Sequence, residues 1–200
     1  MKTLISMVFR GDVTKIAAYR LSPDRLILFD CKDHEHQKVS KKAIQDLKDA
    51  FSKLPVKIEV KYTKMYDIVQ IAHDVIKCID EEHSKGSEIH LHISEGRKTH
   101  YLGFLMAAYS RKGKVAGAYY LVQEENGRVL KLPLLSLKPS KAKQAILKEI
   151  SKGNKNVISM TKKLKKTKGI IYIHIRELRE DGFIEKDELE LTEVGKISIL

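Results

Sequence analysis

Apolar positions in residues 1–135 follow two alternating spacings. Short runs such as 26–29 and strict alternation at 89–93 are typical of strands, whereas apolar residues three and four positions apart are typical of amphipathic helices. We predict strands at 4–9, 25–31, 56–62, 89–93, 115–122 and 129–135, and helices at 13–21, 40–54, 67–85 and 98–111. Ser40 is the expected N-cap of the second helix, and Asn126-Gly127 is a hairpin signal between the last two strands. This order predicts an α/β fold with a mostly parallel, doubly wound sheet that ends in an antiparallel hairpin.

The pattern changes after Pro139, which we take as the domain boundary between residues 1–138 and 139–200. Three helices are expected at 140–151, 157–166 and 170–181, with a turn at 167–169 before the third. A small hairpin at 183–191 and a last element from residue 192 complete the tail. Three helices followed by a β-wing predict a C-terminal winged helix-turn-helix domain.

The charge distribution favours a polyanionic partner. The 200 residues carry a formal net charge of +12, and residues 138–168 hold eleven lysines against one acid, Glu149. A surface rich in Lys and Glu would also suit a thermophile. The longest apolar runs are far short of a membrane span, and residues 1–10 are expected to form a strand rather than a signal peptide. Two cysteines make no disulfide framework, which favours a reducing cytoplasm.

The tail's third helix is the candidate recognition helix for DNA. Residues off its apolar face would meet the major groove, and lysines of the preceding helix and turn would meet phosphates. The candidate DNA-binding residues are Lys162, Lys163, Lys165, Lys166, Lys168, Gly169, Tyr172, Ile173 and Arg176. The alternative is a winged helix that serves only dimer or partner contacts, with its lysines as a solvated face.

Two small-residue turns are candidates for binding an anionic ligand. Each follows a strand and precedes a helix, where backbone N–H groups and the helix dipole favour negative charge. Cations at the start of the helix predicted at 98–111 would otherwise be mildly unfavourable, because the helix dipole is positive there. A bound anion would explain them. The candidate ligand-binding residues are Phe9, Arg10, Gly11, Asp12, Ser94, Glu95, Gly96, Arg97, Lys98 and Thr99.

Several other chemistries lack a sequence signal. The glycine patterns of dinucleotide sites and P-loops are missing, so NAD and ATP are not expected as cofactors. The segment Asp30–His36 has the composition of a metal site but not the spacing, and a polar strand-to-helix loop is expected instead. His90 and His92 share a strand face and are expected in the core or at a subunit contact. We assign no catalytic residue, metal or cofactor.

Over nearly its whole length the chain resembles the CARF-domain (CRISPR-associated Rossmann-fold) winged-helix transcriptional regulators of archaea. The resemblance rests on the domain order and on the turns Phe9-Arg10-Gly11-Asp12-Val13-Thr14 and Ser94-Glu95-Gly96-Arg97-Lys98-Thr99. Glu95 stands where the family has a first glycine, and an extra carboxylate beside phosphates is unfavourable. The resemblance implies a Rossmann-like domain, a homodimer, and a cyclic oligoadenylate, the tetra-adenylate above all, across the two-fold axis.

The function implied is a ligand-responsive, DNA-binding regulator of CRISPR-associated genes in antiviral defence. Two alternatives stay open. Some relatives cleave the ligand slowly, which would make the protein a ring nuclease in which Arg97 or Lys98 stabilises phosphate charge. The other alternative is a sensor whose winged helix binds RNA or protein.

Overall fold

A computed structural model describes residues 1–122, 127–135 and 139–200 of the chain. The chain divides into two compact units, residues 1–136 and 137–200. Of the expected hairpin turn Asn126-Gly127, Asn126 lies outside the described residues, as does the linker residue Lys138. Among the described residues, no helix combines the length and the hydrophobicity that crossing a bilayer requires.

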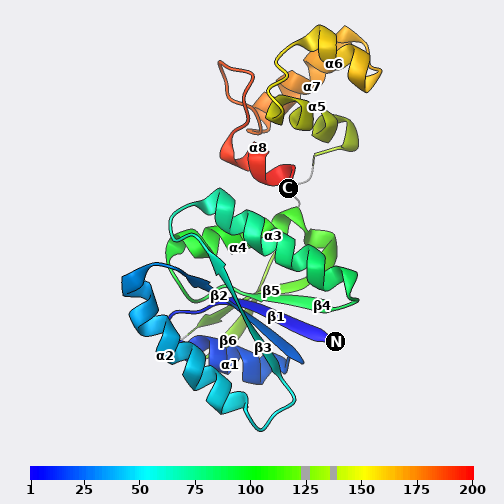
Figure 1. Ribbon diagram of the computed structural model, residues 1–200. Helices are drawn as coiled ribbons and strands as arrows, with labels where there is room; N and C mark the ends of the chain where they lie inside the picture. Colours follow the sequence, from blue (N-terminus) through cyan, green and yellow to red (C-terminus); the bar gives the residue numbers. More distant parts are fainter. Residues whose placement is uncertain (123–126, 136–138) are drawn as a thin grey trace. The chain divides into compact units, whose positions relative to one another are not determined.

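The N-terminal unit is built on a six-stranded sheet in the order β3-β2-β1-β4-β5-β6 (Figure 1). All neighbouring pairs are parallel except the last, β5 with β6, which is antiparallel. The predicted mostly parallel sheet with a terminal antiparallel pair is therefore confirmed. The strands are β1 (Lys2–Met7), β2 (Arg25–Cys31), β3 (Lys57–Thr63), β4 (Glu88–His92), β5 (Val115–Val122) and β6 (Arg128–Leu132).

Helices cover both faces of this sheet, which is why its central strands are buried on both sides. Helices α1 and α2 lie on one face, and α3 and α4 lie on the other (Figure 1). Gly103 allows α3 and α4 to approach closely, since a Cβ there would meet the Ile71 side chain at 2.5 Å. The helices are α1 (Asp12–Leu21), α2 (His34–Phe51), α3 (Ile68–Ser84) and α4 (Lys98–Ser110), with a short 3-10 turn η1 (Lys112–Lys114).

Strand order places the candidate turns side by side. From β1 the chain runs outward through β2 to β3 and then returns to β4, on the other side of β1. The carboxyl ends of β1 and β4 therefore adjoin where the winding direction reverses. In doubly wound sheets, the crevice at this switch point is where ligands bind.

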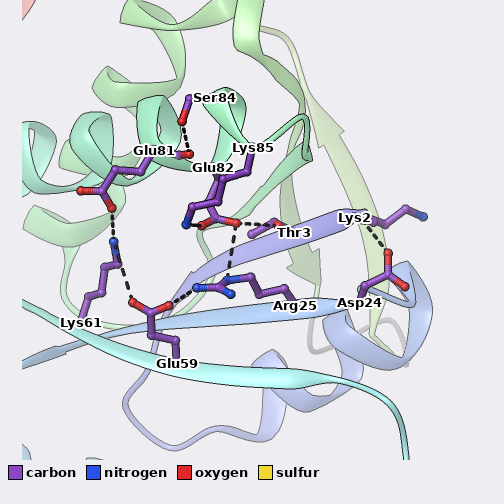
Figure 2. Close-up of polar contacts among 10 residues, drawn as sticks. All are labelled: Lys2, Thr3, Asp24, Arg25, Glu59, Lys61, Glu81, Glu82, Ser84 and Lys85. Atoms are coloured by element: carbon purple, nitrogen blue, oxygen red, sulfur yellow. Dashed lines mark hydrogen bonds and ion pairs between the residues drawn. The ribbon is translucent and has the colours of Figure 1, made fainter.

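The opposite, amino edge of the sheet is closed by ion pairs (Figure 2). Glu82 of α3 is fully buried and accepts hydrogen bonds from Thr3 Oγ1 at 3.1 Å and Lys85 Nζ at 2.6 Å. Arg25 lies between Glu82 and Glu59 and contacts both carboxylates. These contacts tie α3 to the amino edge of the sheet.

Helix α2 begins six residues earlier than its apolar pattern predicted. Asp33 is its N-cap, with Oδ1 accepting from the His36 amide at 3.0 Å, whereas Ser40 lies buried inside the helix. The predicted N-cap was therefore wrong, and the segment expected to be a polar loop is the end of β2 and the first turn of α2. Among the described residues, no group of three His, Cys, Asp or Glu side chains could hold a metal ion.

The C-terminal unit packs its helices around a separate apolar core. That core includes Ile171, Ile175 and Leu178, the predicted inward face of the third helix. The helices are α5 (Lys141–Ser151), α6 (Val157–Leu164), α7 (Lys168–Glu180) and α8 (Glu193–Ser198). A single antiparallel bridge joins Ile184 to Leu191, where a small hairpin was expected. The winged-helix assignment of this unit stays a prediction.

The start of α7 differs from the prediction. Thr167 caps the helix, its Oγ1 accepting from the Ile170 amide at 3.4 Å. Lys168 and Gly169 therefore belong to the first helical turn, and the predicted turn at 167–169 was wrong. The change of direction falls instead at Lys165, whose φ is +51°.

Candidate functional site

Glycines in the left-handed conformation shape both turns at the switch point. Gly11 has φ +85° at the N-cap of α1, and Gly96 has φ +86° just before α4. A Cβ on Gly96 would meet Met7 Cγ at 2.7 Å and His100 Nδ1 at 2.9 Å, whereas one on Gly11 would meet the Ala43 Cβ at 3.1 Å. Other residues are strained at such φ values, so both turns need glycine.

Two cavities open beside these turns and share Phe9 and Gly96 in their walls. The larger has a volume of about 540 Å³ and the smaller about 340 Å³. All ten predicted ligand residues except Gly11 line one of the two cavities. The larger is lined by Phe9, His36, Tyr66, Gly96, Arg97, Lys98 and Thr99, and the smaller includes Phe9, Arg10, Asp12, Ser94, Glu95 and Gly96.

The Glu95 carboxylate joins the two turns. It accepts from the amides of Gly11 at 2.7 Å and Phe9 at 3.2 Å, and from Thr14 Oγ1 at 2.9 Å. Only 7% of Glu95 is exposed, and burial raises the pKa of its carboxyl. The charge that seemed unfavourable beside phosphates therefore points into the fold, where it bonds the turn that precedes α1.

This arrangement leaves the two turns with different anion-binding capacity. Glu95 already engages the amides of Phe9 and Gly11 just before α1, so an external anion would meet a buried carboxylate there. At α4, the Arg97 amide donates to His100 Nδ1 at 3.0 Å. The Lys98 and Thr99 amides follow in the first helical turn, where a helix offers no internal acceptors. The N-terminus of α4 is therefore the better place for an anion.

Two buried histidines hold the surrounding loops. His36 Nε2 lies 3.1 Å from the Val8 carbonyl oxygen and 3.2 Å from Asp30 Oδ1. His100 accepts the Arg97 amide on Nδ1, so its Nε2 carries the hydrogen and donates to the Lys64 carbonyl at 3.2 Å. Burial lowers the pKa of His100 to about 4, so this imidazole is neutral at pH 7.

A chain of polar contacts runs from the core to the Glu95 carboxylate. His92 Nδ1 lies 2.9 Å from Ser6 Oγ, which lies 3.0 Å from Thr14 Oγ1, the hydroxyl that donates to Glu95. Burial lowers the pKa of His92 to about 4. His92 is thus a core histidine, one of the two environments expected for it. His90 is also buried, with Nε2 2.9 Å from Glu88 and Nδ1 3.2 Å from the Tyr119 hydroxyl.

Cations and an aromatic ring line the open side of the larger cavity. Arg97 lies over the Tyr66 ring at 5.5 Å, Tyr66 is 67% exposed, and Lys98 is exposed. The sequence analysis did not include Tyr66 or His36 among the ligand-binding residues. Their positions could have indicated them, since His36 follows the carboxyl end of β2 and Tyr66 follows that of the neighbouring β3. Charged donors beside an exposed ring suit a ligand that combines phosphate with a stacking base.

Two predicted ligand residues use their hydroxyl groups within the fold. Thr99 Oγ1 donates to the Met65 carbonyl at 2.6 Å, which ties α4 to the β3–α3 loop. Ser94 Oγ accepts from the Leu121 amide at 2.6 Å. Arg10 and Asp12 are exposed at the smaller cavity. The side chains best placed to meet an anion are therefore Arg97 and Lys98.

The predicted DNA-binding residues all lie on the surface of the C-terminal unit. Lys162 and Lys163 are on α6, Lys165 and Lys166 follow it, and the remaining five are on α7: Lys168, Gly169, Tyr172, Ile173 and Arg176. Lys163 Nζ lies 2.9 Å from Glu149, and Lys168 lies over the Tyr172 ring at 5.8 Å. The result is an exposed surface rich in lysine around one helix.

Comparison with protein families gives one match. A family model described as "HFX_2341_N:-like, N-terminal" matches residues 7–126, which is more than half of the chain. A comparison with curated proteins finds no match.

Solved structures share the fold at low sequence identity. Csm6 from Enterococcus italicus, bound to cyclic hexa-2'-fluoro-hexa-dAMP, is 15% identical with a TM-score of 0.57, covering 92% of this chain and 57% of that chain. Can2 from Sulfobacillus thermosulfidooxidans, in complex with cyclic tetra-adenylate, is 15% identical with a TM-score of 0.50, covering 98% and 63%. Protein VC1899 from Vibrio cholerae is 11% identical with a TM-score of 0.52, covering 98% and 64%.

These similarities concern the fold, and the chain spans less than two thirds of each structure's length. Together with the strand order, they confirm the Rossmann-like fold that the sequence predicted for the N-terminal unit.

Proposed function

The chain belongs to the HFX_2341_N:-like, N-terminal family, and on that premise we propose that it is a cytoplasmic, ligand-responsive regulator. In this proposal the carboxyl edge of the sheet binds a cyclic oligoadenylate, the tetra-adenylate above all, and the C-terminal unit binds DNA as a winged helix. The observation that carries the ligand assignment is the N-terminus of α4, where two amides and two exposed cations adjoin a cavity of about 540 Å³.

The chemistry of the cavity matches an oligonucleotide. Arg97 and Lys98 supply charge for phosphate, and the exposed Tyr66 ring offers a surface on which a base can stack. Csm6 and Can2, which share the fold, were solved with a cyclic oligonucleotide analogue and with cyclic tetra-adenylate. A two-fold symmetric ring fits a homodimer that presents this edge twice, so we propose that two copies share one ligand.

Regulation requires that the ligand bind two arrangements of the dimer with different affinity, since equal affinity would shift nothing. We propose that the bound ring changes the setting of the two winged helices, and thereby the affinity for DNA. Lysines on α6 and α7 support DNA as the target because phosphate contacts supply much of such binding.

Calorimetry with cyclic tetra-adenylate tests the ligand assignment. We expect wild type to bind at one ring per dimer and Arg97→Ala to bind at least tenfold more weakly. Arg20→Ala is the matched control, because Arg20 is exposed at the far end of α1 and lies in neither cavity. Absence of binding by wild type would refute the assignment.

Slow cleavage of the same ring is the second candidate function. In-line attack by a ribose 2′-oxygen on the adjacent phosphorus would form a 2′,3′-cyclic phosphate and break the bond to the 5′-oxygen, which leaves and takes a proton from solvent. Arg97 and Lys98 at one cavity wall would position the phosphate and stabilise its charge. Incubation with labelled cyclic tetra-adenylate separates the two functions, since linear products identify a ring nuclease and an unchanged ring identifies a sensor.

A gel shift with the duplex DNA upstream of the protein's own gene tests DNA binding and its response to the ligand. The double variant Lys168→Ala/Arg176→Ala should lose the shift, and addition of cyclic tetra-adenylate should change it in wild type. A shift with RNA but not with duplex DNA would instead favour the RNA-binding alternative.

A further inference from the structure

The outward face of α7 is apolar at its centre and charged at its ends. Lys168, Tyr172 and Arg176 lie four residues apart along this face, and Gly169 and Ile173 lie beside them. Tyr172 is 52% exposed and Ile173 is 47% exposed. The opposite face of α7 is fully used by the core, so neither side chain is needed to fill it.

Gly169 has no structural reason to be glycine. Its φ is not in the left-handed region, and a Cβ built on it would meet nothing within 4 Å. Glycine in a helix costs up to about 1 kcal/mol relative to alanine, so the fold alone would favour alanine. A glycine on an exposed helix face suits the close approach of another molecule to the backbone.

Charge determines what that molecule can be. Lys162, Lys165, Lys166 and Lys168 are exposed around the first turn of α7, which favours a polyanion over an apolar protein surface. The segment that follows α7 is acidic, with Glu185, Asp187, Glu188 and Glu190 all exposed. This segment would repel phosphates, so a polyanion is expected to contact the lysine-rich surface instead.

Apolar groups at the centre of a basic face have a specific partner in duplex DNA. The thymine C5-methyl group is the apolar feature of the major groove, and aliphatic and aromatic side chains contact it. RNA carries uracil without this methyl group, and its A-form major groove is too narrow for side chains. The face therefore fits B-form DNA better than RNA.

We infer that α7 selects thymine-containing sites in duplex DNA, with Ile173 and Tyr172 against thymine methyl groups and Gly169 allowing the helix to approach the bases. This inference rests on the DNA-binding part of the proposed function. It adds a base preference and names the residues that set it. Lys168 and Arg176 flank this apolar centre and hold the helix on the phosphates or on guanine edges.

The test uses duplexes selected by the full-length protein from a random DNA pool. Recovered sites are resynthesised with uracil in place of thymine, which removes only the methyl groups. We expect affinity to fall about fourfold for each contacted methyl group, from the free energy of burying one such group. In Ile173→Ala, the ratio of the affinities for the thymine and uracil duplexes should move toward one. In Val39→Ala, which truncates an exposed apolar side chain on α2, this ratio should not change.

A second pair of variants tests the close approach. Gly169→Ala should weaken binding to the selected duplexes at least tenfold without loss of thermal stability. Gly113→Ala is the matched control, because a Cβ there also meets nothing within 4 Å, and it should bind as wild type does. Equal binding of thymine and uracil duplexes would overturn the inference while leaving DNA binding intact. Failure to recover any duplex would overturn both.

Discussion

The two turns at the carboxyl edge resemble each other in sequence but differ in what their amides contact. In the β1–α1 turn, the amides of Phe9 and Gly11 donate to the Glu95 carboxylate. In the β4–α4 turn, the amides of Lys98 and Thr99 begin a helix beside a cavity. The first turn therefore already holds an internal carboxylate, whereas the second adjoins a cavity lined by two cations. An acidic residue in an anion-binding motif can therefore stabilise the site by bonding the amides of one of its two turns.

The largest expected effect comes from the glycines. Gly96→Ala should lower the free energy of unfolding by about 4 kcal/mol, because it adds both left-handed strain and close contacts with Met7 and His100. Gly11→Ala adds the same strain but a milder contact with Ala43, so about 2 kcal/mol is expected. Urea denaturation of both variants measures the difference. An equal loss would mean that packing against the β4–α4 turn is looser than the structure indicates.

Replacement of Glu95, the internal anion, has the next largest expected effect on stability. Glu95→Gln should destabilise the protein by about 3 kcal/mol at pH 8, because the amide NH₂ would face buried donors that the carboxylate now accepts. Glu193→Gln is the control, since it removes one exposed ion pair with Lys196 and should change stability by less than about 1 kcal/mol. A loss below about 1 kcal/mol for Glu95→Gln would show that the two turns are not joined through this group.

The sequence identified the residues of both turns because each turn is a continuous segment between a strand and a helix. It could not identify His36 or His100, whose contacts with the Val8 and Lys64 carbonyls span 28 and 36 residues of sequence. Those contacts arise from the order and register of β1, β2, β3 and β4, which no local pattern specifies. The direction of the Glu95 side chain is likewise set by the neighbouring turn rather than by its own segment.

Helix starts were predicted less well than sheet order, for local reasons. Both Asp33 and Ser40 are good N-caps, and the apolar pattern favoured Ser40 because the residues between them are mostly polar. The imidazole of His36 is nevertheless buried, because it bonds the Val8 carbonyl. At α7, Gly169 was interpreted as a turn residue, although Thr167 caps the helix before it.

The polar chain that ends at Glu95 should make the link between the turns sensitive to acid. Burial lowers the pKa of His92 from 6.5 to about 4, so the unfolded chain binds this proton more readily than the folded chain does. Its stabilising contribution is present above pH 6.5 and is lost as pH falls toward 4. We expect about 2 kcal/mol to be lost between pH 7 and pH 5. Urea denaturation across this range should show a flatter profile for His92→Asn, while His73→Asn, an exposed histidine on α3, should follow wild type.

The smallest expected effect is the loss of ligand affinity when a cation of either turn is removed. Lys98 stands at the open helix N-terminus, and Arg10 stands at the turn whose amides Glu95 occupies. Lys98→Ala should weaken cyclic tetra-adenylate binding about tenfold, because it removes charge where backbone amides can also reach a phosphate. Arg10→Ala should weaken binding by about threefold or less, because its charge acts beside a turn that already holds the Glu95 carboxylate. Calorimetry on the two single variants measures both effects, and a larger loss for Arg10→Ala would place the phosphates at the β1–α1 turn and require Glu95 to leave it on binding.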